Sequence, residues 1–251
     1  MSLQVPEDEQ QLRSRRQDKS DLSFNGVAHR SESEEAKVVA FTTDHRHFSL
    51  IRTLHVADFI TLLNGFCGVM SIFSSLRYCL GKPEDVFNLY LAIAYTPFGL
   101  FFDFMDGKVA RLRKKSSLMG QELDSLADLV SFGVAPACCA FSLGFRTTVD
   151  NLVLVYFILC GLSRLARFNV TVANLPKDAS GKSKYFEGTP IPTTLSLVFL
   201  MAYWVHKKWI LDSIPYGVLG QGQWYEVHPT VGLFFLSGCA MISKSLHIPK
   251  I

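Results

Sequence analysis

The sequence contains few charged residues and no strong excess of either sign. Of its 251 residues, 19% are charged and 49% are hydrophobic, and the formal net charge is +3. So small a charge, without a basic stripe interleaved with aromatic residues, argues against a nucleic-acid partner. The mean hydropathy of +0.22 is high for a soluble domain whose surface is solvated. The composition therefore favours a protein that contacts membrane lipids.

Several common sequence signals are also missing. The six cysteines form no CxxC pair and no HExxH sequence is present, so the sequence indicates neither a zinc site nor a redox centre. We expect buried, reduced thiols instead. The first apolar run begins near Leu54, too far along the chain for a secretory signal peptide. We therefore expect the first membrane-spanning helix to act as its own signal.

The sequence does contain a series of apolar runs, each about as long as a bilayer is thick. Residues 1–50 are polar and charged, which predicts a disordered or interfacial cytosolic tail. Residues 51–251 form the predicted transmembrane domain. We predict an all-α, polytopic integral membrane fold with six transmembrane helices. Their expected ranges are 54–78, 86–105, 118–143, 152–169, 191–210 and 230–246.

Basic residues are unevenly distributed over the links between these runs. Positively charged links tend to stay in the cytosol. We therefore expect the second-to-third link, the fourth-to-fifth link and both termini to face the cytosol. Lys207 and Lys208, in the fifth-to-sixth link, lie on the opposite side and weaken this prediction. The basic residues of the two cytosolic links are Lys108, Arg111, Arg113, Lys114, Lys115, Lys177, Lys182 and Lys184.

Four aspartates occupy the second and third runs, where a plain membrane anchor has none. At the centre of a membrane helix each costs roughly 2.5–3.5 kcal/mol on the insertion scale. Asp103 and Asp106 are three residues apart, and Asp124 and Asp128 are four apart, so each pair shares a helix face. The short link between the runs can bring the two faces together. Converging carboxylates predict bound Mg²⁺ or Mn²⁺, and two such ions polarise a diphosphate.

Small and basic neighbours fit the same interpretation. Gly107 and Gly120 leave the backbone open to a nucleotide, and Ala110 is small on the same face. Arg111 can hold a phosphate with two hydrogen bonds. The spacing alone leaves another interpretation open, in which the aspartates form an intramembrane ion pair or proton pathway with Arg111, Arg164 or Arg167.

The run that begins at Asp103 resembles the signature of the CDP-alcohol phosphotransferase family, D-x2-D-G-x2-A-R-x8-G-x3-D-x3-D. Every fixed position of the signature is filled, which makes the resemblance highly specific and displaces the ion-pair interpretation. The residues at the fixed positions are Asp103, Asp106, Gly107, Ala110, Arg111, Gly120, Asp124 and Asp128.

The resemblance implies roles for these residues. Asp103, Asp106 and Asp124 are implied to ligate two divalent cations, Mg²⁺ or Mn²⁺. Asp128 is implied to contact the second ion and to take the proton from an acceptor hydroxyl. The family's fold implies six transmembrane helices, commonly in a homodimer or larger homo-oligomer, with the site open to the cytosolic leaflet. The implied CDP-lipid-binding residues are Gly107, Arg111 and Ser117, to which the small residues Ala110 and Gly120 and the intramembrane amide Asn64 are added.

Three sequence segments outside the signature indicate which acceptor substrate the family resemblance implies. Residues 58–68, 161–169 and 186–192 are similar to the family's serine-using branch, and the long polar tail resembles its fungal, endoplasmic-reticulum form. This implies CDP-diacylglycerol and L-serine as substrates, among membrane lipids. Arg164 and Arg167 suit the carboxylate of serine, and Phe168 suits its ammonium group. Both arginines can instead neutralise lipid phosphates, and Asn64 can instead form a helix–helix hydrogen bond.

Two alternative functions follow from the residues. The same chemistry can use glycerol 3-phosphate or inositol as the acceptor, although a glycerol-phosphate pocket would need more cations. A transporter or proton relay would need polar residues throughout the bilayer. In this sequence they gather at one end of the second to fourth spans, which disfavours transport.

Overall fold

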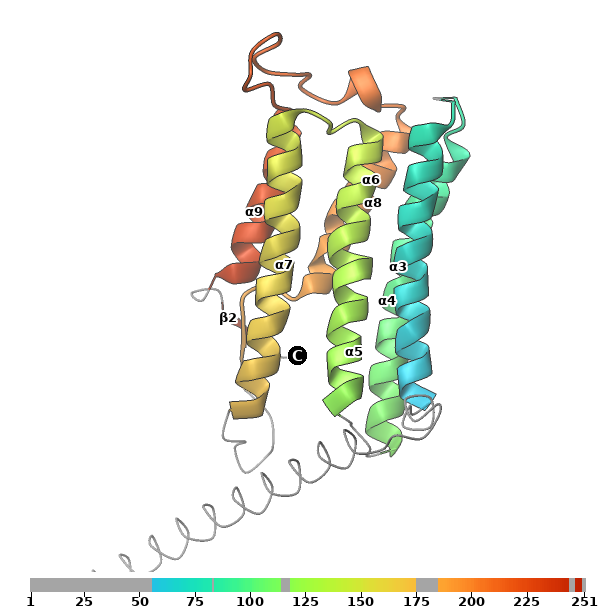
Figure 1. Cartoon of the computed structure of the whole chain (residues 1–251), viewed down its shortest axis with the longest axis vertical. Helices are drawn as coiled ribbons and strands as arrows, with labels where there is room; N and C mark the ends of the chain where they lie inside the picture. The colour runs from blue at the N-terminus through green and yellow to red at the C-terminus, as the bar shows by residue number, and fades with distance from the viewer. Residues whose placement is uncertain (1–55, 83, 114–117, 175–184, 244–246, 250–251) are drawn as a thin grey trace, which may run out of the picture. The chain divides into compact units, whose positions relative to one another are not determined.

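A computed structural model describes residues 56–82, 84–113, 118–174, 185–243 and 247–249 (Figure 1). The predicted disordered or interfacial tail, residues 1–50, lies outside these residues. The long helices are α3 (Val56–Leu80), α4 (Phe87–Arg113) and α7 (Thr148–Asn174). Shorter ones are α5 (Leu118–Asp128), α6 (Ala135–Leu143), α8 (Leu195–His206) and α9 (Gly232–Ile242).

The helices run back and forth between two ends of a bundle. Figure 1 shows the end of α4, the start of α5 and the end of α7 at one end, together with the start of α3. The links from α3 to α4, from α6 to α7 and from α8 to α9 lie at the other end. The described chain also contains three short 3₁₀ turns: Ile191–Thr194 before α8, Leu211–Ser213 after it and Pro229–Val231 before α9.

The predicted all-α membrane fold is confirmed, with one small exception. Strands β1 (Tyr185–Glu187) and β2 (His247–Pro249) form a two-stranded antiparallel ladder, which the apolar pattern gave no reason to expect. Three helices are long and apolar enough to cross a membrane: Val56–Leu80, Met119–Leu143 and Thr148–Val170. Helix α4 is long enough, but its second half carries ionisable residues. The apolar segments Ile191–His206 and Pro229–Ile242 are shorter.

Several predicted helix ends were wrong. The second helix continues past residue 105 to Arg113, so Asp103 and Asp106 lie inside it rather than at its end. The fourth helix starts earlier, where the Thr147 hydroxyl accepts a hydrogen bond from the Asp150 backbone N–H. The fifth stops at His206, because Lys208 takes a positive φ of 59° that a helix cannot continue through. The sixth stops at Ile242, and Ser243 is already extended.

The third predicted span has the predicted ends but an unexpected interior. Residues Leu129–Val134 form a π-helical segment between α5 and α6. A π turn holds an extra residue and so leaves backbone carbonyl groups without their usual partners. Within this segment, the Phe132 carbonyl oxygen accepts a 2.8 Å hydrogen bond from the Thr194 hydroxyl. Such segments are frequent at functional sites, and this one begins directly after Asp128.

The two halves of the bundle are packed differently. Around α6 to α9 the core is aromatic and aliphatic, with Phe132, Phe145, Phe157 and Phe234 almost fully buried. Helix α3 instead buries small and polar residues against α4 and the π-helical segment. Close approach of backbones through small residues is how helices associate inside membranes. The buried small and polar residues of α3 include Thr61, Asn64, Gly68, Ser71, Ser74 and Ser75.

The closest such contact is at Gly68. A methyl group added there would lie 2.9 Å from the Ser131 backbone nitrogen and 2.6 Å from its hydroxyl oxygen. Gly68→Ala should therefore force α3 away from the π-helical segment. Overpacking of this kind costs about 1–3 kcal/mol, so we expect a lower melting temperature of the detergent-solubilised protein.

The matched control is Gly232→Ala, because a methyl group at Gly232 would meet no atom of the described residues within 4 Å. If Gly68→Ala and Gly232→Ala had equal melting temperatures, the close contact between α3 and the π-helical segment at Gly68 would be refuted.

Candidate active site

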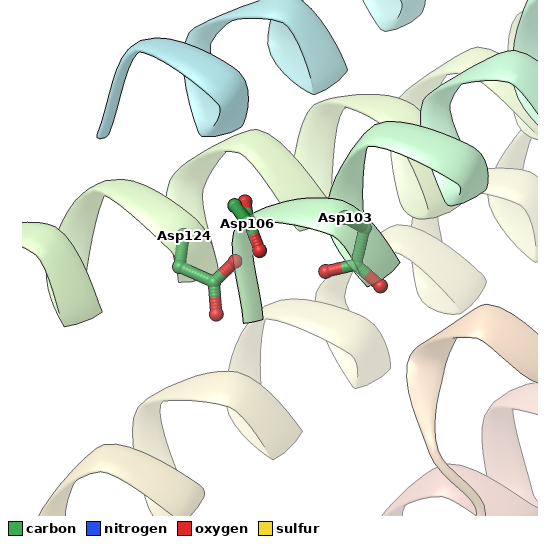
Figure 2. A group of neighbouring side chains, drawn as sticks. All are labelled: Asp103, Asp106 and Asp124. Carbon is green, nitrogen blue, oxygen red and sulfur yellow. The ribbon is translucent and has the colours of Figure 1, made fainter. Parts of the chain in front are cut away.

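Three aspartates from two helices meet at one point of the bundle. Figure 2 shows Asp103 and Asp106 on α4 and Asp124 on α5, with their carboxylates turned toward a common space. One carboxylate oxygen from each lies within 4.8 Å of the others. Asp106 is buried and the other two are partly buried. Three of the four aspartates expected to converge therefore form one group.

The fourth aspartate, Asp128, ends α5 one turn beyond Asp124. It lies within electrostatic range of Asp103 and Asp124. Its Oδ1 accepts a hydrogen bond of 3.1 Å from Nδ2 of Asn64 on α3. Of the two interpretations open for Asn64, the structure contains the helix–helix hydrogen bond. Its partner is a carboxylate of the predicted site, so Asn64 fixes the orientation of Asp128.

A third helix thus supplies side chains that orient the aspartates. Thr61, one turn before Asn64 on α3, donates a 2.6 Å hydrogen bond to Oδ2 of Asp106. Both side chains are buried. Thr61 was not among the predicted site residues, because a threonine in an apolar helix is not distinctive. Its spacing of three residues from Asn64 was the available signal, because it places both on one face of α3.

The arrangement fits divalent cations. At an effective dielectric constant of about 20, two unit charges 4.8 Å apart repel by roughly 3–4 kcal/mol, and here several such pairs share one space. Oδ1 of Asp124 is buried and has no hydrogen-bond partner among the described residues, as expected of an oxygen that ligates a metal. All the converging donors are carboxylate oxygens, which Mg²⁺ and Mn²⁺ prefer.

Basic residues do not neutralise the aspartates within the described part of the chain. Arg164 on α7 is buried and lies within electrostatic range of Asp128, but forms no ion pair with it there. The Arg164 guanidinium lies 5.6 Å from the ring centre of Phe168. Arg167 donates a 3.2 Å hydrogen bond to the Ile242 carbonyl oxygen at the end of α9. The two predicted serine-binding arginines therefore have different partners: Arg164 lies near Asp128 and the Phe168 ring, and Arg167 contacts the end of α9.

A polar link joins α5 and α7 beside the site, and the sequence did not reveal it. The Ser125 hydroxyl donates to Oδ1 of Asn169 at 3.1 Å. Nδ2 of Asn169 in turn donates to Oε2 of Glu122 at 3.1 Å. Ser125 directly follows Asp124, so these bonds hold the α7 segment that carries Arg164 and Phe168 against the helix of the metal-ligand candidates.

The remaining predicted residues are placed incompletely. Gly107 follows Asp106 on α4 and Gly120 lies one turn before Asp124 on α5, as the spacing predicts. Ala110 and Arg111 belong to α4, but their side chains lie outside the described part of the structure, as does Ser117. Their predicted contacts with a CDP-lipid therefore stay predictions.

Comparison with known proteins agrees with this geometry. Residues 54–228 match the model of the CDP-alcohol phosphatidyltransferase family. A protein of Saccharomyces cerevisiae named CDP-diacylglycerol–serine O-phosphatidyltransferase is 62% identical over 212 residues, 84% of this chain and 76% of the relative. A Bacillus subtilis protein of the same name is 36% identical over 140 residues, which cover 55% of this chain and 70% of the relative.

A more distant relative has a related name. The archaetidylserine synthase of Methanothermobacter thermautotrophicus is 34% identical over 154 residues, 59% of this chain and 58% of the relative. The extent of the family match and the identity to the yeast protein leave no ambiguity about the class. The chain belongs to the CDP-alcohol phosphatidyltransferase family.

The Thr61 hydrogen bond can be tested by substitution. Thr61→Val keeps the shape of the side chain but removes the donor to Asp106. Loss of a group that orients a metal ligand typically weakens metal binding about 10- to 100-fold. We expect the apparent Kd for Mn²⁺, measured by electron paramagnetic resonance on the purified protein, to rise within that range, and Thr61→Ser to restore it.

Thr96→Val is the matched control. Thr96 is fully buried on α4 and its hydroxyl has no hydrogen-bond partner among the described residues. Unchanged Mn²⁺ affinity in Thr61→Val, or equal losses in both variants, would contradict an orienting role for Thr61.

Proposed function

We propose that this protein transfers the phosphatidyl group of CDP-diacylglycerol to the hydroxyl of L-serine, giving phosphatidylserine and CMP. The observation that carries the proposal is the convergence of Asp103, Asp106 and Asp124 from α4 and α5. These residues stand at fixed positions of the family signature. Two relatives named CDP-diacylglycerol–serine O-phosphatidyltransferase support serine as the acceptor, as opposed to glycerol 3-phosphate or inositol.

Asp103, Asp106, Asp124 and Asp128 are the residues that would hold two divalent cations, Mg²⁺ or Mn²⁺. When bound, such ions neutralise the diphosphate of the CDP-lipid and stabilise the charge that develops on the departing CMP. The chain's own contribution is to fix the carboxylates beforehand. Thr61 holds Asp106 and Asn64 holds Asp128, so the ligand oxygens need little rearrangement.

Asp128 is the proposed general base. It accepts the proton of the serine hydroxyl while the hydroxyl oxygen attacks the phosphorus that carries the diacylglycerol oxygen. The new oxygen–phosphorus bond forms as the bond from this phosphorus to the bridging diphosphate oxygen breaks, and CMP leaves with that electron pair. Asn64 would hold the carboxylate in place during this step, through its hydrogen bond to Oδ1 of Asp128.

Arg164 is the proposed partner of the serine carboxylate. It is buried, it faces Asp128, and it forms no ion pair among the described residues, so its donors can serve a substrate. Phe168 stacks near the same guanidinium and is proposed to close the acceptor site. Arg167 is the weaker candidate, since it bonds to the end of α9.

The CDP-lipid is proposed to lie along the α4–α5 turn. Gly107, Ala110 and Gly120 would admit the nucleotide close to the backbone, and Arg111 and Ser117 would contact its phosphates. Asn64 would border the nucleotide while it holds Asp128. We further propose a homodimer or larger homo-oligomer in the endoplasmic reticulum, with the aspartates and both termini on the cytosolic side.

The proposal predicts a specific acceptor and a metal requirement. Purified protein with CDP-diacylglycerol should release CMP when serine is added, and not with inositol or glycerol 3-phosphate. A chelator should abolish release, and Mg²⁺ or Mn²⁺ should restore it. The measurement is CMP by chromatography, with each acceptor tested under a metal titration.

The control is Asp128→Asn, which removes the proposed base but not the other three carboxylates. General-base catalysis typically contributes about 10²- to 10⁴-fold in rate. We expect a loss of that size in kcat with CDP-diacylglycerol binding retained. CMP release without metal, or with inositol in place of serine, is the result that would overturn the proposed function.

The proposed acceptor site predicts that a substitution of Arg164 changes the KM for serine but not the KM for CDP-diacylglycerol. Arg164→Gln removes a charge-assisted contact worth about 1.5–3 kcal/mol, so the KM for serine should rise roughly 10- to 100-fold. The KM for CDP-diacylglycerol should stay near that of the parent. Arg77→Gln is the control, because Arg77 is exposed near the other end of α3. A rise in the CDP-diacylglycerol KM with serine unaffected would reassign Arg164 to the lipid substrate.

A further inference from the structure

The exposed tryptophan and tyrosine side chains gather at the end of the bundle away from the aspartates. Two lie at helix ends there and four in the link between α8 and α9, residues 207–227, which we name the aromatic loop. Along the helices the exposed large side chains are mostly phenylalanine, leucine and valine. Among the described residues, the exposed tryptophans and tyrosines are Tyr90, Tyr203, Trp209, Tyr216, Trp224 and Tyr225.

The aromatic loop is an ordered element with an inner and an outer face. Leu219 and Val227 exchange two backbone hydrogen bonds, of 2.9 and 3.2 Å. Inside, Ile214 is buried against Gly144. Outside, Tyr216 and Trp224 are 84% and 85% exposed. A tryptophan this exposed on a well-paired loop indicates an external partner for the outer face.

The loop is also fixed to the bundle at its far end. The buried His228 ring contacts Asp150 of α7, with 2.6 Å between Nδ1 and Oδ2. The His228 backbone N–H donates to the other Asp150 oxygen at 3.0 Å. Phe145 packs edge-on against the same ring at 5.4 Å. The end of the aromatic loop is therefore bonded to α7 through His228 and Asp150.

The helices that flank the loop are short for a bilayer. At 1.5 Å per residue, Ile191–His206 and Pro229–Ile242 extend about 24 and 21 Å. The hydrocarbon core is about 30 Å thick. Since these apolar segments end early, the aromatic loop lies close to the depth at which headgroups begin. Backbone placed there needs internal hydrogen bonds, which the Leu219–Val227 pairing and the turns around it supply.

We propose that the outer face of the aromatic loop binds the headgroup–acyl boundary of the leaflet opposite the aspartates. Tryptophan and tyrosine prefer this layer, because their rings are apolar while the N–H or O–H still reaches water or a phosphate. Lys207 and Lys208 are exposed at the base of the loop, where they suit lipid phosphates. The loop thus sets the depth of the bundle, and with it the depth of the aspartates.

Tryptophan fluorescence can test this placement directly, because the three tryptophans of the chain, Trp204, Trp209 and Trp224, all lie in or beside the loop. Parent protein and Trp224→Phe are placed in phosphatidylcholine nanodiscs, with or without bromine near the carbonyl end of the acyl chains. The difference between the two emission spectra isolates Trp224. We expect this difference to be blue-shifted, quenched by the brominated lipid and resistant to aqueous iodide.

Trp224→Phe should keep the fold, since Trp224 contacts only its neighbour Tyr225 among the described aromatic residues. Unchanged CMP release from CDP-diacylglycerol confirms this independently of the fluorescence. Quenching of the Trp224 component by iodide and not by bromine would place the loop in water and overturn the proposal. Protection from both quenchers would indicate a protein partner or second copy, and would overturn it equally.

Discussion

Negative charge held inside an apolar helix bundle is the constraint on which the rest of this structure depends. Several carboxylates share a space in which single oxygens lie within 4.8 Å of one another. Without compensation such an arrangement would drive α4 and α5 apart. The side chains around it make the repulsion tolerable by donating hydrogen bonds from α3, and they leave one Asp124 oxygen for a cation. The same contacts between α3, α4 and α5 therefore stabilise the bundle and shape the candidate metal site.

This constraint explains why the two halves of the bundle are packed by different kinds of side chain. The half made of α6 to α9 is held together by large, buried aromatic side chains, which stabilise the fold but carry no reactive groups. The half that carries the aspartates needs helices close enough for short polar side chains to reach across. Gly68 against Ser131, with a further close contact between Gly99 and Asn64, provides that closeness. Small residues on α3 therefore serve the chemistry indirectly, by bringing Thr61 and Asn64 within hydrogen-bonding distance.

Much of this was predictable, because membrane helices and metal ligands both impose spacing on a sequence. The apolar runs located the helices, and the spacing of the aspartates predicted that Asp103, Asp106 and Asp124 meet, as Figure 2 shows. Helix ends were less predictable. Asp103 and Asp106 look like residues at a boundary, yet they lie inside α4 because their partner is another helix rather than water. The roles of Thr61 and Asn169 depend on which helices pack against each other. The spacing of residues within one helix does not predict those contacts.

The π-helical segment after Asp128 lies between two parts of one span, α5 and α6, whose side chains must point in different directions. On one side α6 is locked into the aromatic core, and on the other α5 points its carboxylates at α4. Each residue of an α-helix advances the direction of its side chains by about 100°. Loss of one residue from this segment would turn the wide turn into an ordinary one and swing Asp124 and Asp128 away from α4, although every aspartate remained. The number of residues between the carboxylates and the core is therefore as important to the candidate active site as the carboxylates themselves.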